Sequence, residues 1–143
     1  LSAFKIYLSD IGLLRKLAEV PVAALVTKDD VIGYREFKGA FAENYVLQSL
    51  STQSTVNLRY WTSNNSAEVD FLLQYDTHIL PIEVKSGKST SSRSLTLYNA
   101  EKHPILRIRY SDKELKLDDN LLNIPLYMAD WTFALLDRVI ASL

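Results

Sequence analysis

The feature that most constrains this chain is a pair of short apolar runs separated by a polar turn. The runs are Val69–Leu73 and Ile79–Val84, and they flank the stretch Tyr75-Asp76-Thr77-His78. Runs of this length on either side of a short polar segment are typical of a β-hairpin. A hairpin register also decides which side chains lie opposite one another, so the same stretch predicts part of a functional site.

The predicted register brings three charged side chains together. If Asp76 and Thr77 form a two-residue loop, counting outward sets Asp70 opposite Glu83. Residues directly opposite in an antiparallel pair point to the same face of the sheet. Because side chains alternate along a strand, Lys85 shares that face with Glu83. Two carboxylates and one ammonium are therefore expected on one patch of an otherwise apolar hairpin.

This patch has two interpretations. Paired carboxylates suit Mg²⁺, which takes one or two of them and completes its octahedron with water and substrate phosphate. The neighbouring ammonium of Lys85 could then hold a phosphate oxygen or orient the attacking water. The alternative is a cross-strand ion pair, which contributes well under ~1 kcal/mol when exposed. Spacing does not decide between them, because a one-residue slip in register would separate the groups.

Further acidic residues lie close to the hairpin in the sequence. A helix with apolar residues at helical spacing is predicted from residue 36 or 39 to residue 50, and Glu43 lies in its middle. Glu43 is either a solvated surface glutamate, the commoner fate of a lone acid, or a third carboxylate directed at the patch. Glu68 shares a strand face with Asp70 and ranks below Glu43 as a candidate.

The segments after the hairpin predict the fold class. Leu95–Lys102 is expected to be a helix and Ile105–Tyr110 a strand. A helix between two apolar strands predicts a crossover that joins a parallel pair. The chain is therefore expected to be an α/β fold with a central mixed β-sheet, an antiparallel hairpin plus a parallel crossover strand, flanked by helices.

The two ends of the chain are predicted from local patterns. Residues 3–8 alternate weakly and predict a short strand, after which Ser9 or Asp10 is expected to be the N-cap of a helix through Leu17. Asp130 is expected to cap a final apolar helix. This helix either closes the core or meets a partner, and closure is favoured.

Basic side chains gather in the loop and helix that follow the hairpin. They are Lys88, Arg93 and Lys102. One interpretation is that they are solvated charges; the other is that Lys88 and Arg93 position phosphate groups beside a metal site. Cysteine is absent and there are only two histidines, so thiolate and histidine metal sites are not expected.

These residues resemble two groupings of known proteins, one nested in the other. Asp70, the Glu83-Val84-Lys85 stretch after Pro81-Ile82 and an upstream helical glutamate resemble the PD-(D/E)XK nuclease superfamily. A closer resemblance is to a domain of unknown function at the C-terminus of bacterial and archaeal AAA-type ATPases. The segments that carry this second resemblance are Phe4–Leu14, Lys38–Val46, Tyr60–Phe71 and Pro81–Lys88.

The resemblance implies a restriction-endonuclease-like core and specific roles. Asp70 and Glu83, with the backbone carbonyl of Val84, would hold Mg²⁺ or Mn²⁺, and Glu43 would complete the metal shell. Lys85 would assist the attacking water or stabilise transition-state charge. The implied activity is hydrolysis of DNA by a nuclease domain. The alternative is a non-catalytic accessory module of the ATPase that binds DNA or a protein.

The resemblance also implies an organisation. Residues 1–34 would continue from an upstream ATPase and winged-helix region, which alone would bind ATP, and residues 35–143 would be the nuclease-like domain. The start at Leu1, inside a patterned segment, agrees with a piece of a longer protein. Junction-type nucleases of this fold often pair, so a homodimer is a further expectation.

Composition narrows the functional classes. The net charge is −1, which gives no global basic field of the kind found in many DNA-binding domains. No apolar run reaches the ~18 residues of a membrane span, and no charged-then-apolar signal-peptide pattern appears in these residues, so neither is expected. The lack of cysteine fits a reducing compartment. The sequence therefore predicts a cytoplasmic protein without a membrane partner.

Overall fold

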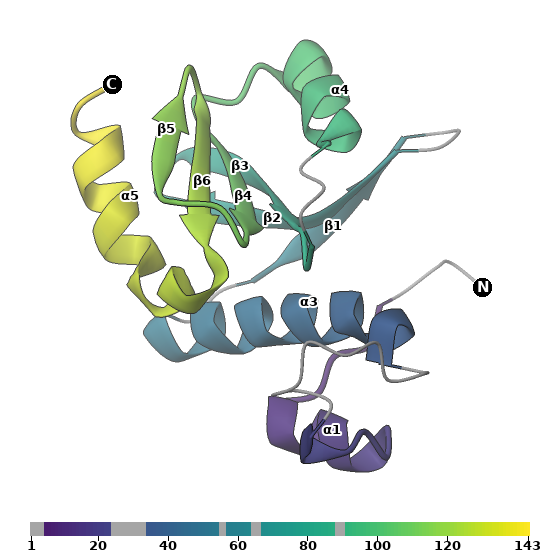
Figure 1. The fold of residues 1–143 in the computed structure, drawn as a ribbon. Helices are drawn as coiled ribbons and strands as arrows, with labels where there is room; N and C mark the ends of the chain where they lie inside the picture. The colour runs from purple at the N-terminus through teal and green to yellow at the C-terminus, as the bar shows by residue number, and fades with distance from the viewer. Residues whose placement is uncertain (1–4, 24–33, 55–56, 64–66, 88–90) are drawn as a thin grey trace.

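A six-stranded mixed sheet forms the centre of the fold (Figure 1). The computed structural model describes residues 5–23, 34–54, 57–63, 67–87 and 91–143. The strands are β1 (Arg59–Thr62), β2 (Glu68–Tyr75), β3 (His78–Val84), β4 (Arg107–Ser111), β5 (Lys116–Asp118) and β6 (Leu121–Pro125). They lie in the order β1-β2-β3-β4-β6-β5. Neighbours β3, β4 and β6 are parallel and the other pairs are antiparallel, which confirms the predicted mixed α/β sheet.

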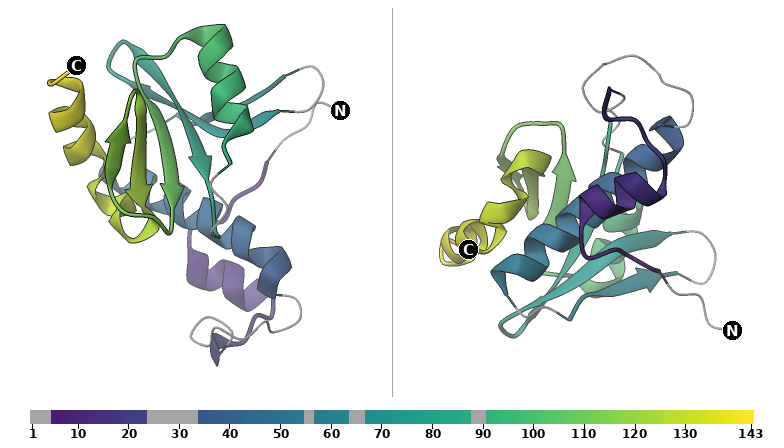
Figure 2. Two further views of the ribbon diagram at one scale, coloured as in Figure 1. Left: turned by 45° about the horizontal axis from the view of Figure 1, so that its top comes forward. Right: turned by 90° about the horizontal axis from the view of Figure 1, so that it is seen from below.

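Helices cover both faces of the sheet (Figures 1 and 2). The described ones are α1 (Ile11–Leu17), α3 (Tyr34–Gln53), α4 (Arg93–Lys102), the 3-10 helix η1 (Leu126–Trp131) and α5 (Thr132–Ile140). The long helix α3 lies along one face with α1 outside it, and α4 lies on the other (Figure 1). Within these ranges, no helix is both long enough and apolar enough to cross a membrane.

The main core lies between α3 and the sheet. Val46 and Leu50 of α3 are fully buried, and they belong to one apolar cluster with Ile82 of β3, Ile108 of β4 and Ile124 of β6. The apolar alternation along each strand places these side chains on the same face. Fully burying one such side chain contributes about 1.5–3 kcal/mol, so this layer fixes how α3 lies on the hairpin.

The crossover from β3 through α4 to β4 has the predicted connectivity. Leu95 and Tyr98 of α4 are buried in a second cluster with Val69 of β2.

Pro81 explains why the pairing of β3 differs along its length. It lies opposite Leu72 of β2, while the pairing with β4 begins only after it, at Ile82. A proline lacks the N–H that a ladder on both sides would need.

The N-terminal segment confirms one prediction and contradicts another. Asp10 is the N-cap of α1 and accepts a hydrogen bond from the Leu13 N–H at 2.7 Å, as predicted. The predicted strand over residues 3–8 is wrong where it can be checked, because residues 5–8 pair with no strand in the described chain. The main chain of Leu8 bonds to a side chain of α3 instead, as described below.

The C-terminal helix α5 packs against the main core, which confirms the favoured prediction that it closes the core. Leu136 of α5 is fully buried in the main cluster, and Phe133 packs against the cluster. The prediction that Asp130 caps this helix is wrong. Asp130 lies inside η1, and Trp131 occupies the N-cap position without a side-chain hydrogen bond.

Candidate active site

The hairpin register places Asp70 beside the end of β3. Pairs run from Tyr75 opposite His78 to Phe71 opposite Ile82, which is the register predicted from the sequence. Main-chain pairing stops there. Asp70 Oδ2 then accepts a hydrogen bond from the Val84 N–H at 2.8 Å. A side chain has taken the place of a main-chain partner, so the carboxylate is held at the point where the two strands separate.

Glu83 is the most buried acid of the site. Only 4 % of it is exposed, and its Oε1 forms an ion pair with Lys85 Nζ. Its Oε2 is also buried and has no hydrogen-bond partner within the described part of the chain. An unsatisfied buried polar group costs about 1–3 kcal/mol, and more when it is charged. The buried Oε2 of Glu83 therefore lowers the stability of the folded chain. A cation or a hydrogen-bond donor bound to this oxygen would remove that cost.

Two residues of the N-terminal segment join the acidic patch from outside the hairpin. Tyr7 Oη donates a hydrogen bond to Glu43 Oε2 at 3.0 Å. Lys5 Nζ lies 3.6 Å from the same Glu43 oxygen and 3.6 Å from Asp70 Oδ1, and it forms an ion pair with Glu68. Glu43 therefore projects toward the hairpin, and the interpretation of it as a solvated surface acid is wrong.

The pKa of Asp70 is shifted by its burial and by the charged side chains around it. It is raised from 3.8 to about 6, mainly by burial and to a smaller extent by the carboxylates of Glu43 and Glu83. The Val84 N–H and the Lys5 ammonium oppose these effects. Burial lowers the pKa of Lys5, but its ion pair with Glu68 and the charge of Glu43 outweigh burial and raise it overall.

The charge of the cluster does not cancel. It contains four carboxylates and two ammonium groups, which leaves two negative charges when all are ionised. The members are Glu43, Glu68, Asp70, Glu83, Lys5 and Lys85. One divalent cation would neutralise this excess. In the part of the chain that the structure describes, however, no three His, Cys, Asp or Glu side chains are arranged to hold a metal ion. The four carboxylates lie close together, but each forms an ion pair with Lys5 or Lys85.

The other predicted site residues have different outcomes. Lys88 lies outside the described residues. Arg93 is the exposed first residue of α4, and Lys102, at the end of the same helix, pairs with Glu101 at 2.8 Å. The N–H of Val84 is used by Asp70. The role of the Val84 carbonyl as a metal ligand stays a prediction.

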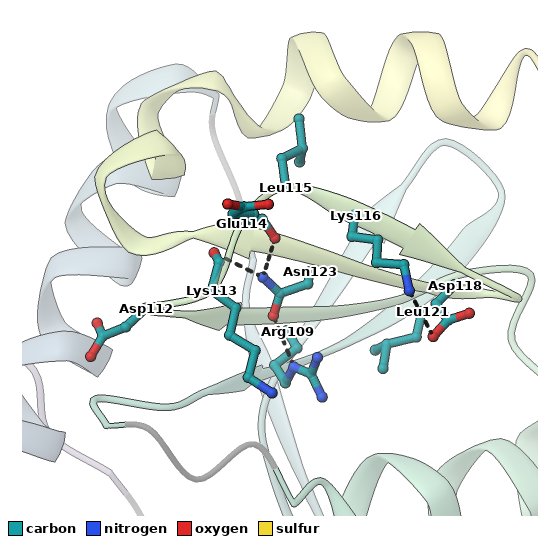
Figure 3. Close-up of a pocket in the computed structure, with 9 residues that line it drawn as sticks. All are labelled: Arg109, Asp112, Lys113, Glu114, Leu115, Lys116, Asp118, Leu121 and Asn123. Carbon is teal, nitrogen blue, oxygen red and sulfur yellow. Dashed lines mark hydrogen bonds and ion pairs between the residues drawn. The ribbon is translucent and has the colours of Figure 1, made fainter.

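A polar row continues from the site across the sheet. Glu83 pairs with Arg109 of β4, which pairs with Asn123 of β6, so the three side chains share one face. Arg109 Nε donates to Asn123 Oδ1 at 2.9 Å. Both residues line a hollow of about 630 Å³ (Figure 3). Its charged lining is mixed and balanced: Arg109, Lys113, Lys116, Asp112, Glu114 and Asp118.

Sequence reasoning missed the residues that the N-terminal segment contributes. Lys5 and Tyr7 lie two residues apart, a spacing that puts both side chains on one side of an extended segment. That spacing was the available signal. Asn44 of α3 holds this segment: it is 2 % exposed and bonds to the main chain of Leu8.

The fold and the site define a class: an α/β domain whose mixed sheet carries an acid–lysine cluster at the end of its central hairpin. The chain matches the family described as Domain of unknown function (DUF4143) over residues 38–128, more than half of its 143 residues. It belongs to that family. Comparison with curated proteins and with solved structures found no match.

Proposed function

We propose that this chain is a metal-dependent phosphodiesterase that cleaves DNA, the nuclease-like domain of an AAA-type ATPase. The observation that carries the proposal is the unsatisfied Oε2 of Glu83, buried beside Lys85 and one residue before Val84, whose N–H binds Asp70. Resemblance to PD-(D/E)XK nucleases supplies DNA as the substrate and the ATPase as the context. Charge, burial and residue type agree with this class of chemistry.

The residues fit a Mg²⁺ or Mn²⁺ ion. Carboxylate oxygens are the ligands that these hard cations prefer, and two carboxylates suffice for Mg²⁺ when water and phosphate complete the shell. Asp70 and Glu83 would hold the ion, with Glu43 and the Val84 carbonyl as further candidate ligands. A cation here would satisfy Glu83 Oε2 and would favour the ionised form of Asp70, whose pKa is about 6.

The chain's own residues would then have separate tasks. A bound divalent ion would polarise the phosphoryl group and lower the pKa of the attacking water. Glu83 holds the Lys85 ammonium by an ion pair, where it can stabilise the negative charge that develops on the phosphoryl oxygens. The Val84 N–H fixes the orientation of Asp70. Tyr7 does the same for Glu43.

The test combines calorimetric titration of Mn²⁺ with a nuclease assay on DNA. Glu83→Gln should abolish both metal binding and cleavage, because a neutral amide replaces the charged ligand. Lys85→Met should retain metal binding and lose about 10²–10³-fold in cleavage rate. Glu101→Gln, which removes one exposed acid on α4, is the control and should behave as wild type. Wild-type cleavage by Lys85→Met would refute the assigned mechanism.

A second function is favoured by one specific observation. All four carboxylates of the cluster already have a lysine partner, either Lys5 or Lys85. A cluster neutralised in this way suits a non-catalytic accessory module of the ATPase that binds DNA or a protein. The same experiment separates the two functions. Absence of saturable metal binding at millimolar Mn²⁺, with DNA or protein binding retained, would favour the accessory module.

A further inference from the structure

The side-chain amide of Asn44 in α3 binds both main-chain groups of Leu8 in the N-terminal segment, as a neighbouring strand would. Asn44 Oδ1 accepts from the Leu8 N–H at 2.8 Å, and its Nδ2 donates to the Leu8 carbonyl at 3.0 Å. The Ile11 N–H donates to Gln48 Oε1 at 2.9 Å. Because Asn44 is buried, these bonds are shielded from water and fix the segment in one register on the helix.

The same attachment determines where Tyr7 and Lys5 lie. The Tyr7 ring packs against Phe71 of β2, with the ring centroids 5.4 Å apart, and its hydroxyl donates to Glu43. Two residues earlier, the Lys5 ammonium lies equally close, at 3.6 Å, to an oxygen of Glu43 and an oxygen of Asp70. One protein cation therefore bridges the acid from α3 and the acid from the hairpin.

We propose that Lys5 is a built-in competitor of the divalent cation. The inference rests on the proposed function and adds its regulation. Glu43 Oε2 is engaged by Tyr7 and Lys5, and the Asp70 oxygens are engaged by Lys5 and the Val84 N–H. A metal ion that uses both acids must take the place of the ammonium, since two cations cannot share these oxygens without strong repulsion.

The arrangement of the carboxylates agrees with this competition. Lys5 also draws Glu68, an acid at the edge of the cluster, toward the same point. Lys85 pairs with the fourth acid, Glu83. Three acids thus surround the Lys5 ammonium, while in the described residues no three acids are arranged to hold a metal ion. Release of Lys5 is the change that frees Glu43 and Asp70 together, so the N-terminal segment controls access of the metal to the site.

The test measures Mn²⁺ affinity by calorimetry for four forms of the full chain: wild type, Lys5→Met, Lys5→Arg and Lys16→Met. Lys5→Met should bind Mn²⁺ about tenfold more tightly than wild type, because the competing charge is gone. Lys5→Arg keeps the charge and should stay within about twofold of wild type. Lys16 is an exposed residue of α1, and its variant controls for net charge.

A second measurement follows the segment itself. Amide NMR signals of residues 5–8 should shift as Mg²⁺ is added to wild type, because Lys5 leaves the cluster. The shifts should be absent in Asp70→Asn. Circular dichroism checks that each variant is folded.

The outcomes separate the two proposals. Equal or weaker Mn²⁺ binding by Lys5→Met would overturn the competition and leave the metal site standing. Absence of binding by every form at millimolar Mn²⁺ would overturn the proposed function, and the competition would fall with it.

Discussion

Asp70→Asn should make the folded chain more stable at neutral pH. The wild-type carboxyl has a pKa of about 6 in the folded state, against an ordinary value of 3.8, and burial is the largest cause. A group whose acid pKa is raised by folding binds protons more tightly when folded. Its contribution to stability is therefore fully present below pH ~4 and is lost as the pH rises through about 6.

The size of the effect follows from the shift. A difference of about two pKa units corresponds to about 3 kcal/mol, since each unit is worth about 1.36 kcal/mol. Asparagine has no titrating proton in this range, and its side-chain oxygen can still accept from the Val84 N–H. The free energy of unfolding of the variant, relative to wild type, should therefore rise by about 3 kcal/mol between pH 4 and pH 7.

Urea unfolding of both proteins at several pH values between 4 and 7 measures this difference. Asp112→Asn, which removes an acid at an exposed position, is the matched control and should show no comparable rise. A flat difference across this range for Asp70→Asn would refute the reasoning, because it would mean that the folded environment does not disfavour the charged form of Asp70.

Two further predictions concern the fold that supports the site. Asn123→Ala should lower the free energy of unfolding by about 2–3 kcal/mol, measured by urea denaturation, because it strips the carbonyls of Lys113 and Glu114 of their amide donor. Leu136→Ala should cost about 2–5 kcal/mol in the same assay, because the side chain is fully buried in the main core. Leu97→Ala, at a 42 % exposed position of α4, should cost less than about 1 kcal/mol; a loss as large as that of Leu136→Ala would contradict the assignment of the core.

The hairpin was predictable because its information is local. Two apolar runs and a two-residue turn at Asp76 and Thr77 allow few registers, and a slip of one residue would turn the buried face outward. That register brings Asp70 to the end of β3, where its carboxylate accepts from the Val84 N–H. The crossover through α4 was equally accessible, since a helix between two apolar strands leaves one common connection.

Local sequence patterns gave wrong predictions at two places, where the main chain or a helix end could be satisfied in more than one way. Residues 5–8 alternate like a strand, yet the main chain of Leu8 bonds to the side chain of Asn44 in α3. Asp130 has the composition of a helix cap but lies within η1, because the chain turns through that 3-10 helix before α5 begins. In both places the sequence offers an acceptable local solution, and packing against distant elements selects another.

The sequence by itself determined the mixed α/β sheet and the hairpin register that brings Asp70 to the end of β3, because alternation and turn length act over a few residues. Only the tertiary structure decided that Tyr7 would reach Glu43, a residue 36 positions away, and that Lys5 would enter the acidic cluster. The physical reason is that such contacts depend on which face α3 presents to the sheet. Burial of the whole apolar core sets that orientation, and no single motif encodes it.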